Sequence, residues 1–270
     1  MFENTNFGQY IALDSFLHKR DPRMKFLALL AFIIVVIITK SPWGILALNL
    51  LAVICLSLSK IHLREALATL KPLLPLLILA FLINLFVTEA GDPLIFHWRF
   101  LKISQQSLTN AWVMTLRISA LIFVSNLFLS LTTTAMELSN AITSLLSPLS
   151  KLGLPVQDMG MMMSIALRYI PSLMAETDNL MKAQSSRGAN YDTGGLLLRL
   201  KGLVAVMVPL FISSFRQAEV LAEAMEARAY RSDIRRGKLH PLLLQTQDWI
   251  FFLIFMASLI GIVVWDTQVR

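Results

Sequence analysis

Two arginines, each at the end of a long apolar segment and between two small residues, could take part in specific recognition. The two triplets are Ser186, Arg187, Gly188 and Ala227, Arg228, Ala229. Each segment also carries a proline near its apolar start, Pro171 or Pro209, where we predict a kink. A guanidinium at a helix C-terminus is favoured by the helix dipole and offers a planar, bidentate donor. The pattern predicts two helix tips that each bind a carboxylate in a partner's groove, the alternative being a solvated arginine at each tip.

The rest of the sequence carries no catalytic pattern. It has no HExxH, no GxSxG and no GxxxxGK[ST] motif, and its four histidines are scattered. Its one cysteine cannot form an internal disulfide. We therefore predict that the chain is not an enzyme, that it has no metal site, and that it does not itself bind ATP in a P-loop.

The composition indicates a membrane protein. Hydrophobic residues make up 56% of the 270 residues and charged residues only 15%, against about 25% charged in soluble domains. The net charge is +7, but no basic stripe with interleaved aromatic residues points to nucleic acid. The apolar stretches are continuous, which excludes a transmembrane barrel and favours helices.

Five apolar runs predict an all-α integral membrane protein with about five transmembrane helices. They cover residues 26–39, 45–58, 72–88, 108–131 and 249–265. Lysine and arginine gather before the first run and after the second, so we expect a cytoplasmic N-terminus. The C-terminus would then lie outside, although one re-entrant or additional helix would reverse it.

Residues 132–245 differ from these runs because they combine helical periodicity with regular charges. We predict a capping box at Thr134 and Glu137, followed by long helices over residues 156–187 and 196–230. The predicted organisation is an N-terminal membrane domain over 1–131, a cytoplasmic domain of long helices over 132–245, and a C-terminal transmembrane helix over 246–270.

The first long helix is rich in methionine, whose flexible side chain suits a surface that repacks against different partners. We predict a partner interface at six of these residues, with ordinary core packing as the alternative. They are Met159, Met161, Met162, Met163, Met174 and Met181.

Polar residues inside the apolar runs are few. The run cores contain no aspartate or glutamate, which a proton- or sodium-coupled pump usually needs. Asn84, Arg117 and Asn126 remain, and we expect them to bond between helices, with a ligand contact at Arg117 as the alternative. A stand-alone secondary transporter or channel is therefore the weaker alternative function.

At three places the chain resembles the transmembrane T component of energy-coupling factor (ECF) transporters, the EcfT/CbiQ-like family. The opening from Ser15 to Lys25 is similar to the family's N-terminal motif, and Leu167 to Pro171 to that of its coupling helix. The arginine triplets are similar to its paired alanine–arginine–glycine motifs. They depart from the family pattern at Ser186 and Ala229, which puts the shape of each tip in question.

The resemblance implies a scaffold in the prokaryotic cell membrane. Arg187 and Arg228 would each dock on one of two ABC ATPase subunits, which would bind the ATP and magnesium. The methionine face would bind a membrane S component that captures a vitamin or metal ion. The long helices would be coupling helices that pass ATP-driven movement to the S component, and this chain would hold no cofactor.

Overall fold

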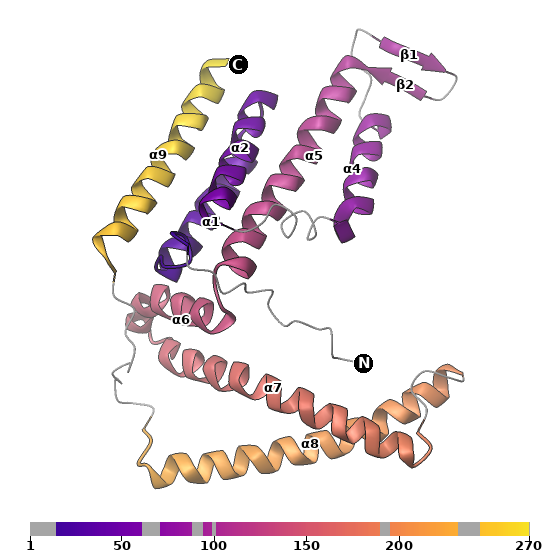
Figure 1. The fold of residues 1–270 in the computed structure, drawn as a ribbon, viewed down its shortest axis with the longest axis vertical. Helices are drawn as coiled ribbons and strands as arrows, with labels where there is room; N and C mark the ends of the chain where they lie inside the picture. The colour runs from indigo at the N-terminus through magenta and orange to yellow at the C-terminus, as the bar shows by residue number, and fades with distance from the viewer. Residues whose placement is uncertain are drawn as a thin grey trace. The chain divides into compact units, whose positions relative to one another are not determined.

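The structure is a computed structural model that describes residues 15–60, 71–87, 94–98, 101–189, 195–231 and 244–269. These residues are helical apart from one short antiparallel hairpin (Figure 1). The α-helices are α1 (Pro22–Ile38), α2 (Pro42–Leu58), α4 (Leu74–Val87), α5 (Gln105–Ser125), α6 (Ala135–Leu145), α7 (Val156–Ser186), α8 (Leu196–Ala227) and α9 (Thr246–Val269). The remaining elements are η1 (Lys71–Leu73), β1 (Leu94–Trp98), β2 (Leu101–Ser104), the π-helix η2 (Asn126–Leu131) and η3 (Ser147–Leu152).

In the part of the chain that the structure describes, the five predicted apolar runs are almost entirely helical, so the prediction of a helical membrane protein is confirmed in its coarse form. Among the described residues, three segments could cross a membrane by length and composition: Gln105–Phe128, Arg199–Ala227 and Thr246–Gln268. Pro42–Leu58 and Lys71–Phe86 are shorter apolar helices. The segment in α8 belongs to the part that we predicted to be cytoplasmic, and both that placement and the total of five spans stay predictions.

The local details follow the residue types. Thr134 and Glu137 form the predicted capping box at the start of α6, with the Thr134 amide donating to Glu137 Oε2 at 3.0 Å and the Glu137 amide to Thr134 Oγ1 at 3.2 Å. Gly153, in the left-handed region at φ 85°, ends η3 before α7 begins. The hairpin of β1 and β2 was not predicted, although apolar and polar residues alternate in β2, because each strand is only four or five residues long.

The contacts divide the chain into two compact units. One unit holds the described residues up to Ile142 together with α9, and the other runs from Thr143 to the end of the second long helix, α8. The boundary therefore falls inside α6.

The first unit is a bundle in which α5 packs on α1, α2 and α4, and α9 packs on α1 and α2. Phenylalanine rings fill its centre: Phe255 of α9 lies 6.5 Å from Phe32 of α1 and 6.0 Å from Phe128 of η2, between ring centroids. All three side chains are buried. Large apolar side chains also cover the outward faces, for example Ile37 at 64% and Ile254 at 66% exposure. A bundle that is apolar both inside and outside is typical of a protein surrounded by lipid.

The turn between α1 and α2 is held by charged side chains from two other helices. Arg117 of α5 donates to the Thr39 carbonyl at 2.6 Å, at the C-terminal end of α1. Asp266 of α9 accepts from the Ser41 amide at 3.0 Å, at the N-terminal end of α2. A cation at a helix C-terminus and an anion at an N-terminus both have the sign that the helix dipoles favour. Arg117 thus serves the bundle, in agreement with a role in helix packing.

This turn leaves no room for a side chain at Gly44. A Cβ there would lie 2.6 Å from Thr39 Cγ2 and 2.8 Å from Asp266 Oδ1. We predict that Gly44→Ala destabilises the protein by about 2 kcal/mol, because overpacking forces the turn apart. Thermal unfolding of the purified protein in detergent would measure the loss.

Gly261→Ala is the matched control, because Gly261 lies in α9 with no atom within 4 Å of the added Cβ. Alanine is favoured over glycine inside a helix, so this variant should be as stable as the wild type or more so. Equal unfolding midpoints for the two variants would contradict the close packing of this turn.

Candidate functional site

The second unit is built on α7 and α8, two long helices of 31 and 32 residues that cross each other (Figure 1). Their C-terminal ends lie on opposite sides of the crossing, and the two arginine triplets lie at these ends. Pro171 and Pro209 lie inside the two helices, each of which continues past its proline. The structure thus brings the predicted site residues onto one pair of helices.

The end of α7 is closed by its own backbone. Arg187 is the C-cap residue, and Gly188 follows in the left-handed region at φ 89°. The Gly188 amide donates to the Ser185 carbonyl at 2.9 Å, and the Ala189 amide donates to the Gln184 carbonyl at 3.0 Å. This pair of bonds is a Schellman motif, which satisfies the last carbonyl groups of the helix.

The end of α8 has the same closure. Arg228 is the C-cap residue, the Ala229 amide donates to the Glu226 carbonyl at 2.8 Å, and the Tyr230 amide donates to the Met225 carbonyl at 3.0 Å. Ala229 takes the left-handed conformation at φ 54°, where glycine would be preferred. The substitution of alanine for glycine therefore leaves the backbone of this tip unchanged and adds strain.

Both arginine side chains are exposed. Among the described residues, no hydrogen bond or ion pair joins either guanidinium to another side chain. Ser186, Gly188, Ala227 and Ala229 are exposed as well. Two similar tips thus each offer one guanidinium, with five N–H donors, that no described residue engages and that lies between small side chains.

The predicted methionine residues lie along α7, and the structure separates them. Met159, Met162 and Met163 are exposed at 56%, 61% and 52%, which is unlike ordinary core packing. Met161, Met174 and Met181 are half-buried.

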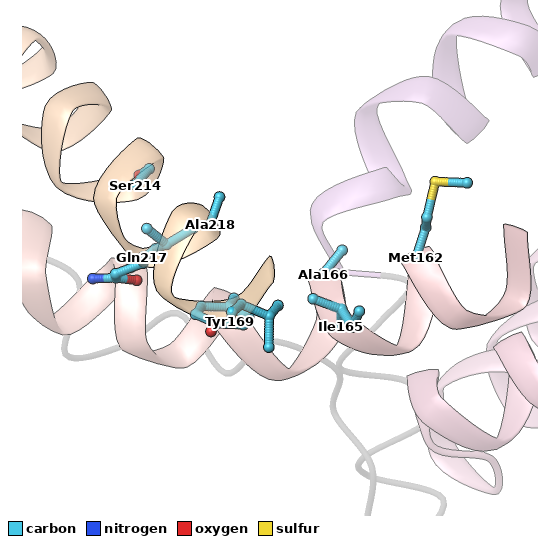
Figure 2. Close-up of a pocket in the computed structure, with 9 residues that line it drawn as sticks. Met162, Ile165, Ala166, Tyr169, Ser214, Gln217 and Ala218 are labelled. Atoms are coloured by element: carbon cyan, nitrogen blue, oxygen red, sulfur yellow. The ribbon is translucent and has the colours of Figure 1, made fainter. Parts of the chain in front are cut away.

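An apolar cavity of about 300 Å³ lies between α7 and α8 (Figure 2). Met162, Ile165 and Tyr169 line it from α7, while Ser214, Gln217 and Ala218 line it from α8. A second hollow of about 490 Å³ is lined by Met161, Arg168 and, again, Tyr169. Met174 and Met181 line neither space. Cavities of this size and apolar lining can receive side chains of a partner.

The polar contact between the two helices was not predicted. Gln217 of α8 donates to Glu176 Oε2 of α7 at 3.0 Å, next to the cavity. Gly160 permits a second close approach in this unit, because a Cβ there would collide with the side chain of Thr143 in α6. Tyr169 could have been singled out from the Leu167 to Pro171 motif, whereas Gln217 and Glu176 lie 41 residues apart and carry no local signal. The described residues contain no group of side chains that could hold a metal ion.

The two tips allow a paired test of backbone strain. Ala229→Gly should stabilise the α8 tip by about 1 kcal/mol, because glycine adopts the left-handed region without a steric cost. Gly188→Ala should destabilise the α7 tip by a similar amount through strain alone, since no atom lies within 4 Å of its added Cβ. Hydrogen exchange of the Tyr230 and Ala189 amides measures each effect. Slower exchange at Ala189 in Gly188→Ala would disprove the shared closure.

Comparison with known proteins identifies the family of the chain. The family model described as "Cobalt transport protein" (CbiQ) matches residues 14–239. The chain is 42% identical over 263 residues to the energy-coupling factor transporter transmembrane protein EcfT of Clostridium kluyveri, covering 97% of this chain and 95% of the relative. It is 39% identical to the protein of the same name from Brevibacillus brevis, covering 99% and 100%, and 37% identical to that from Bacillus subtilis, covering 96% and 98%. The expected resemblance is thereby confirmed, and the chain belongs to the CbiQ family of energy-coupling factor transmembrane proteins.

Proposed function

We propose that this chain is the transmembrane scaffold of an ECF-type ABC importer in a prokaryotic cytoplasmic membrane. It couples ATP hydrolysis by two separate ATPase subunits to reorientation of a membrane S component that carries a vitamin or a metal ion. The ATPase subunits bind the ATP and magnesium, and this chain contributes no catalytic residue. Its N-terminus and the α7–α8 pair face the cytoplasm, where the ATPases are.

The observation that carries this proposal is the matched pair of helix tips. Arg187 and Arg228 are both C-cap residues of long helices, both are exposed, and both tips are closed by the same pair of backbone bonds. Two copies of one structure fit two copies of one partner. Each guanidinium can bind a carboxylate in a groove of an ATPase subunit through two parallel hydrogen bonds.

The helices that carry the tips are long enough to pass movement over a distance. At 1.5 Å per residue, α7 and α8 each extend about 47 Å. Because a helix is stiff, a displacement of its tip by a closing ATPase reaches the rest of the crossing pair. The contact between Gln217 and Glu176 joins the two helices, so that they respond together.

The exposed methionine residues and the cavity support a second contact, with the S component. Met159, Met162 and Met163 present flexible apolar side chains, and Met162 borders the cavity between α7 and α8. An apolar membrane partner can insert side chains there and bury this surface. Methionine adapts its shape to its neighbour, which suits a scaffold that accepts more than one S component.

The tips provide the decisive test. The double variant Arg187→Glu plus Arg228→Glu should no longer recover the ATPase chains when the complex is purified, because a carboxylate in place of each guanidinium repels the partner's carboxylate. Each single variant should recover less than the wild type. Co-purification from cells that express all subunits measures the effect.

Arg216→Glu is the matched control, since Arg216 is an exposed arginine in the interior of α8, beside Gln217, which contacts Glu176 in the interior of α7. This variant should recover the ATPase chains as well as the wild type does. Normal recovery by the double variant would refute the docking role.

The methionine face is tested separately. Replacing Met161, Met162 and Met163 with aspartate should block binding of the S component while the ATPases stay bound, because charged side chains cannot enter an apolar contact. Leu152→Asp, at a residue with 81% exposure in η3, is the control. Uptake by the triple variant at the wild-type rate would count against this interface.

A stand-alone transporter or channel is the weaker candidate. Such a protein needs polar groups that are open to a solute near the middle of the membrane. The side-chain amide of Asn84 donates to the Ala80 carbonyl of its own helix rather than to another helix as expected, and Arg117 donates to Thr39. Asn49 donates to the carbonyls of Ile45 and Leu116. These groups are engaged within the bundle, which favours the scaffold.

A further inference from the structure

The segment from Ser15 to Lys25, at and before the start of α1, contains buried charges for which the proposed function gives no role. Arg20 and Asp21 are each 6% exposed, and Lys25 is 2% exposed. Charged residues are almost never buried this deeply unless they are paired. The contacts of these residues therefore indicate what the segment holds in place.

Arg20 reaches the beginning of α9, 228 residues further along the chain. Its Nη1 lies 3.4 Å from Asp248 Oδ1, and its Nη2 donates to Gln247 Oε1 at 2.8 Å. The guanidinium also lies over the ring of Phe16, at 4.1 Å from the ring centroid. Both partners of this ion pair are buried, with side-chain exposures of 5% and 3%.

Asp248 also starts α9. Its Oδ2 accepts from the Gln245 amide at 2.9 Å, which is the reach-back bond of a capping box, while its Oδ1 accepts from the Asp21 amide at 3.3 Å. One carboxylate thus caps α9 and binds the N-terminal segment. The segment therefore fixes where α9 begins.

Lys25 reaches a different part of the chain. Its Nζ donates to the Thr132 carbonyl at 2.8 Å and to the His18 carbonyl at 3.2 Å. Thr132 ends η2 and lies two residues before Thr134, which caps α6. Lys25 precedes the apolar run of α1, and burial lowers the pKa of its ammonium group to about 8, so that it is still protonated at neutral pH.

These two contacts lie where the chain leaves the membrane bundle and where it returns. The chain passes from the first unit to the second within α6, and it belongs to the first unit again at α9. Arg20, just before α1, binds the beginning of α9, and Lys25, in the first turn of α1, binds the turn that leads from η2 into α6. Because these residues lie where the chain passes between the two units, we call them the crossing clamp: Arg20, Asp21, Lys25, Thr132 and Asp248.

We propose that the crossing clamp fixes the distance between the starts of α6 and α9, and that this fixed base is required for α7 and α8 to transmit movement. This role rests on the proposed function. Without this fixed distance, a force applied at the tips of α7 and α8 would move the starts of α6 and α9 apart instead of reaching the partner in the membrane. The clamp residues are positioning residues, since they act through α6 and α9.

The first test measures the distance between the starts of α6 and α9 in the full-length chain. Spin labels are placed at Ala135 and Thr246, which are exposed at the starts of α6 and α9, after the single native cysteine, Cys55, is changed to alanine. Pulsed electron paramagnetic resonance in lipid nanodiscs should give one narrow distribution of distances between the two labels. Lys25→Met and Asp248→Asn should each broaden it, while Lys25→Arg, which keeps donors for both carbonyls, should preserve it.

The second test measures coupling in the complete complex with its ATPases and S component in liposomes. Lys25→Met should retain ATP hydrolysis but reduce the substrate moved per ATP about tenfold, a typical size for the loss of one coupling interaction. Lys25→Arg should restore most of the ratio. Lys40→Met is the control, since Lys40 is exposed and its side chain lies outside the clamp, and its ratio should equal that of the wild type.

The outcomes separate this inference from the function on which it rests. A narrow distance distribution in Lys25→Met, or an unchanged ratio of substrate to ATP, would overturn the clamp even if the ATPases bind as proposed. Failure of the wild type to bind ATPases would refute the proposed function. The spin-label distances would still test whether the clamp fixes the starts of α6 and α9. If Asp248→Asn does not fold, Arg20→Lys removes the planar fork that joins Asp248 and Gln247 and should broaden the same distribution.

Discussion

The ends of the helices impose the constraint on which the rest of this structure depends. Each helix leaves four amide and four carbonyl groups without partners inside the helix, and an apolar bundle offers little water to satisfy them. In the membrane unit, charged side chains from other helices do so: Arg117 binds the carbonyl of Thr39, Asp266 binds the amide of Ser41, and Lys25 binds the carbonyl of Thr132. The groups that end the helices therefore also decide which helices are neighbours.

The second unit solves the same problem in a different way. The ends of α7 and α8 are closed by their own backbone through paired amide–carbonyl bonds, so neither tip needs a side chain from elsewhere. Arg187 and Arg228 consequently stay exposed and unengaged within the described residues. The contrast separates buried or half-buried cations that hold the bundle together from exposed cations that are available to a partner.

Local signals made much of this arrangement predictable. Continuous apolar runs, the capping box at Thr134 and the glycine after Arg187 each depend on residues a few positions apart, and the structure contains all of them. Other features depend on distant residues and were missed. Gln217 and Glu176 meet across 41 residues, and Arg20 and Asp248 across 228, and nothing in the neighbourhood of either residue indicates its partner. The hairpin of β1 and β2 was also missed, because strands of four and five residues give too short a pattern to stand out.

By itself, the sequence determined the helical class, the membrane character, the family and the position of each arginine at a helix end. These properties follow from composition and short-range spacing, which act through hydrophobic burial and helix capping. Only the tertiary structure decided that Ala229 closes its tip as glycine does, that Met162 borders a cavity between two helices, and that Arg20 binds the start of α9 while Lys25 binds the turn before α6. Such pairings depend on which helix faces pack together, and packing is settled by the whole chain at once.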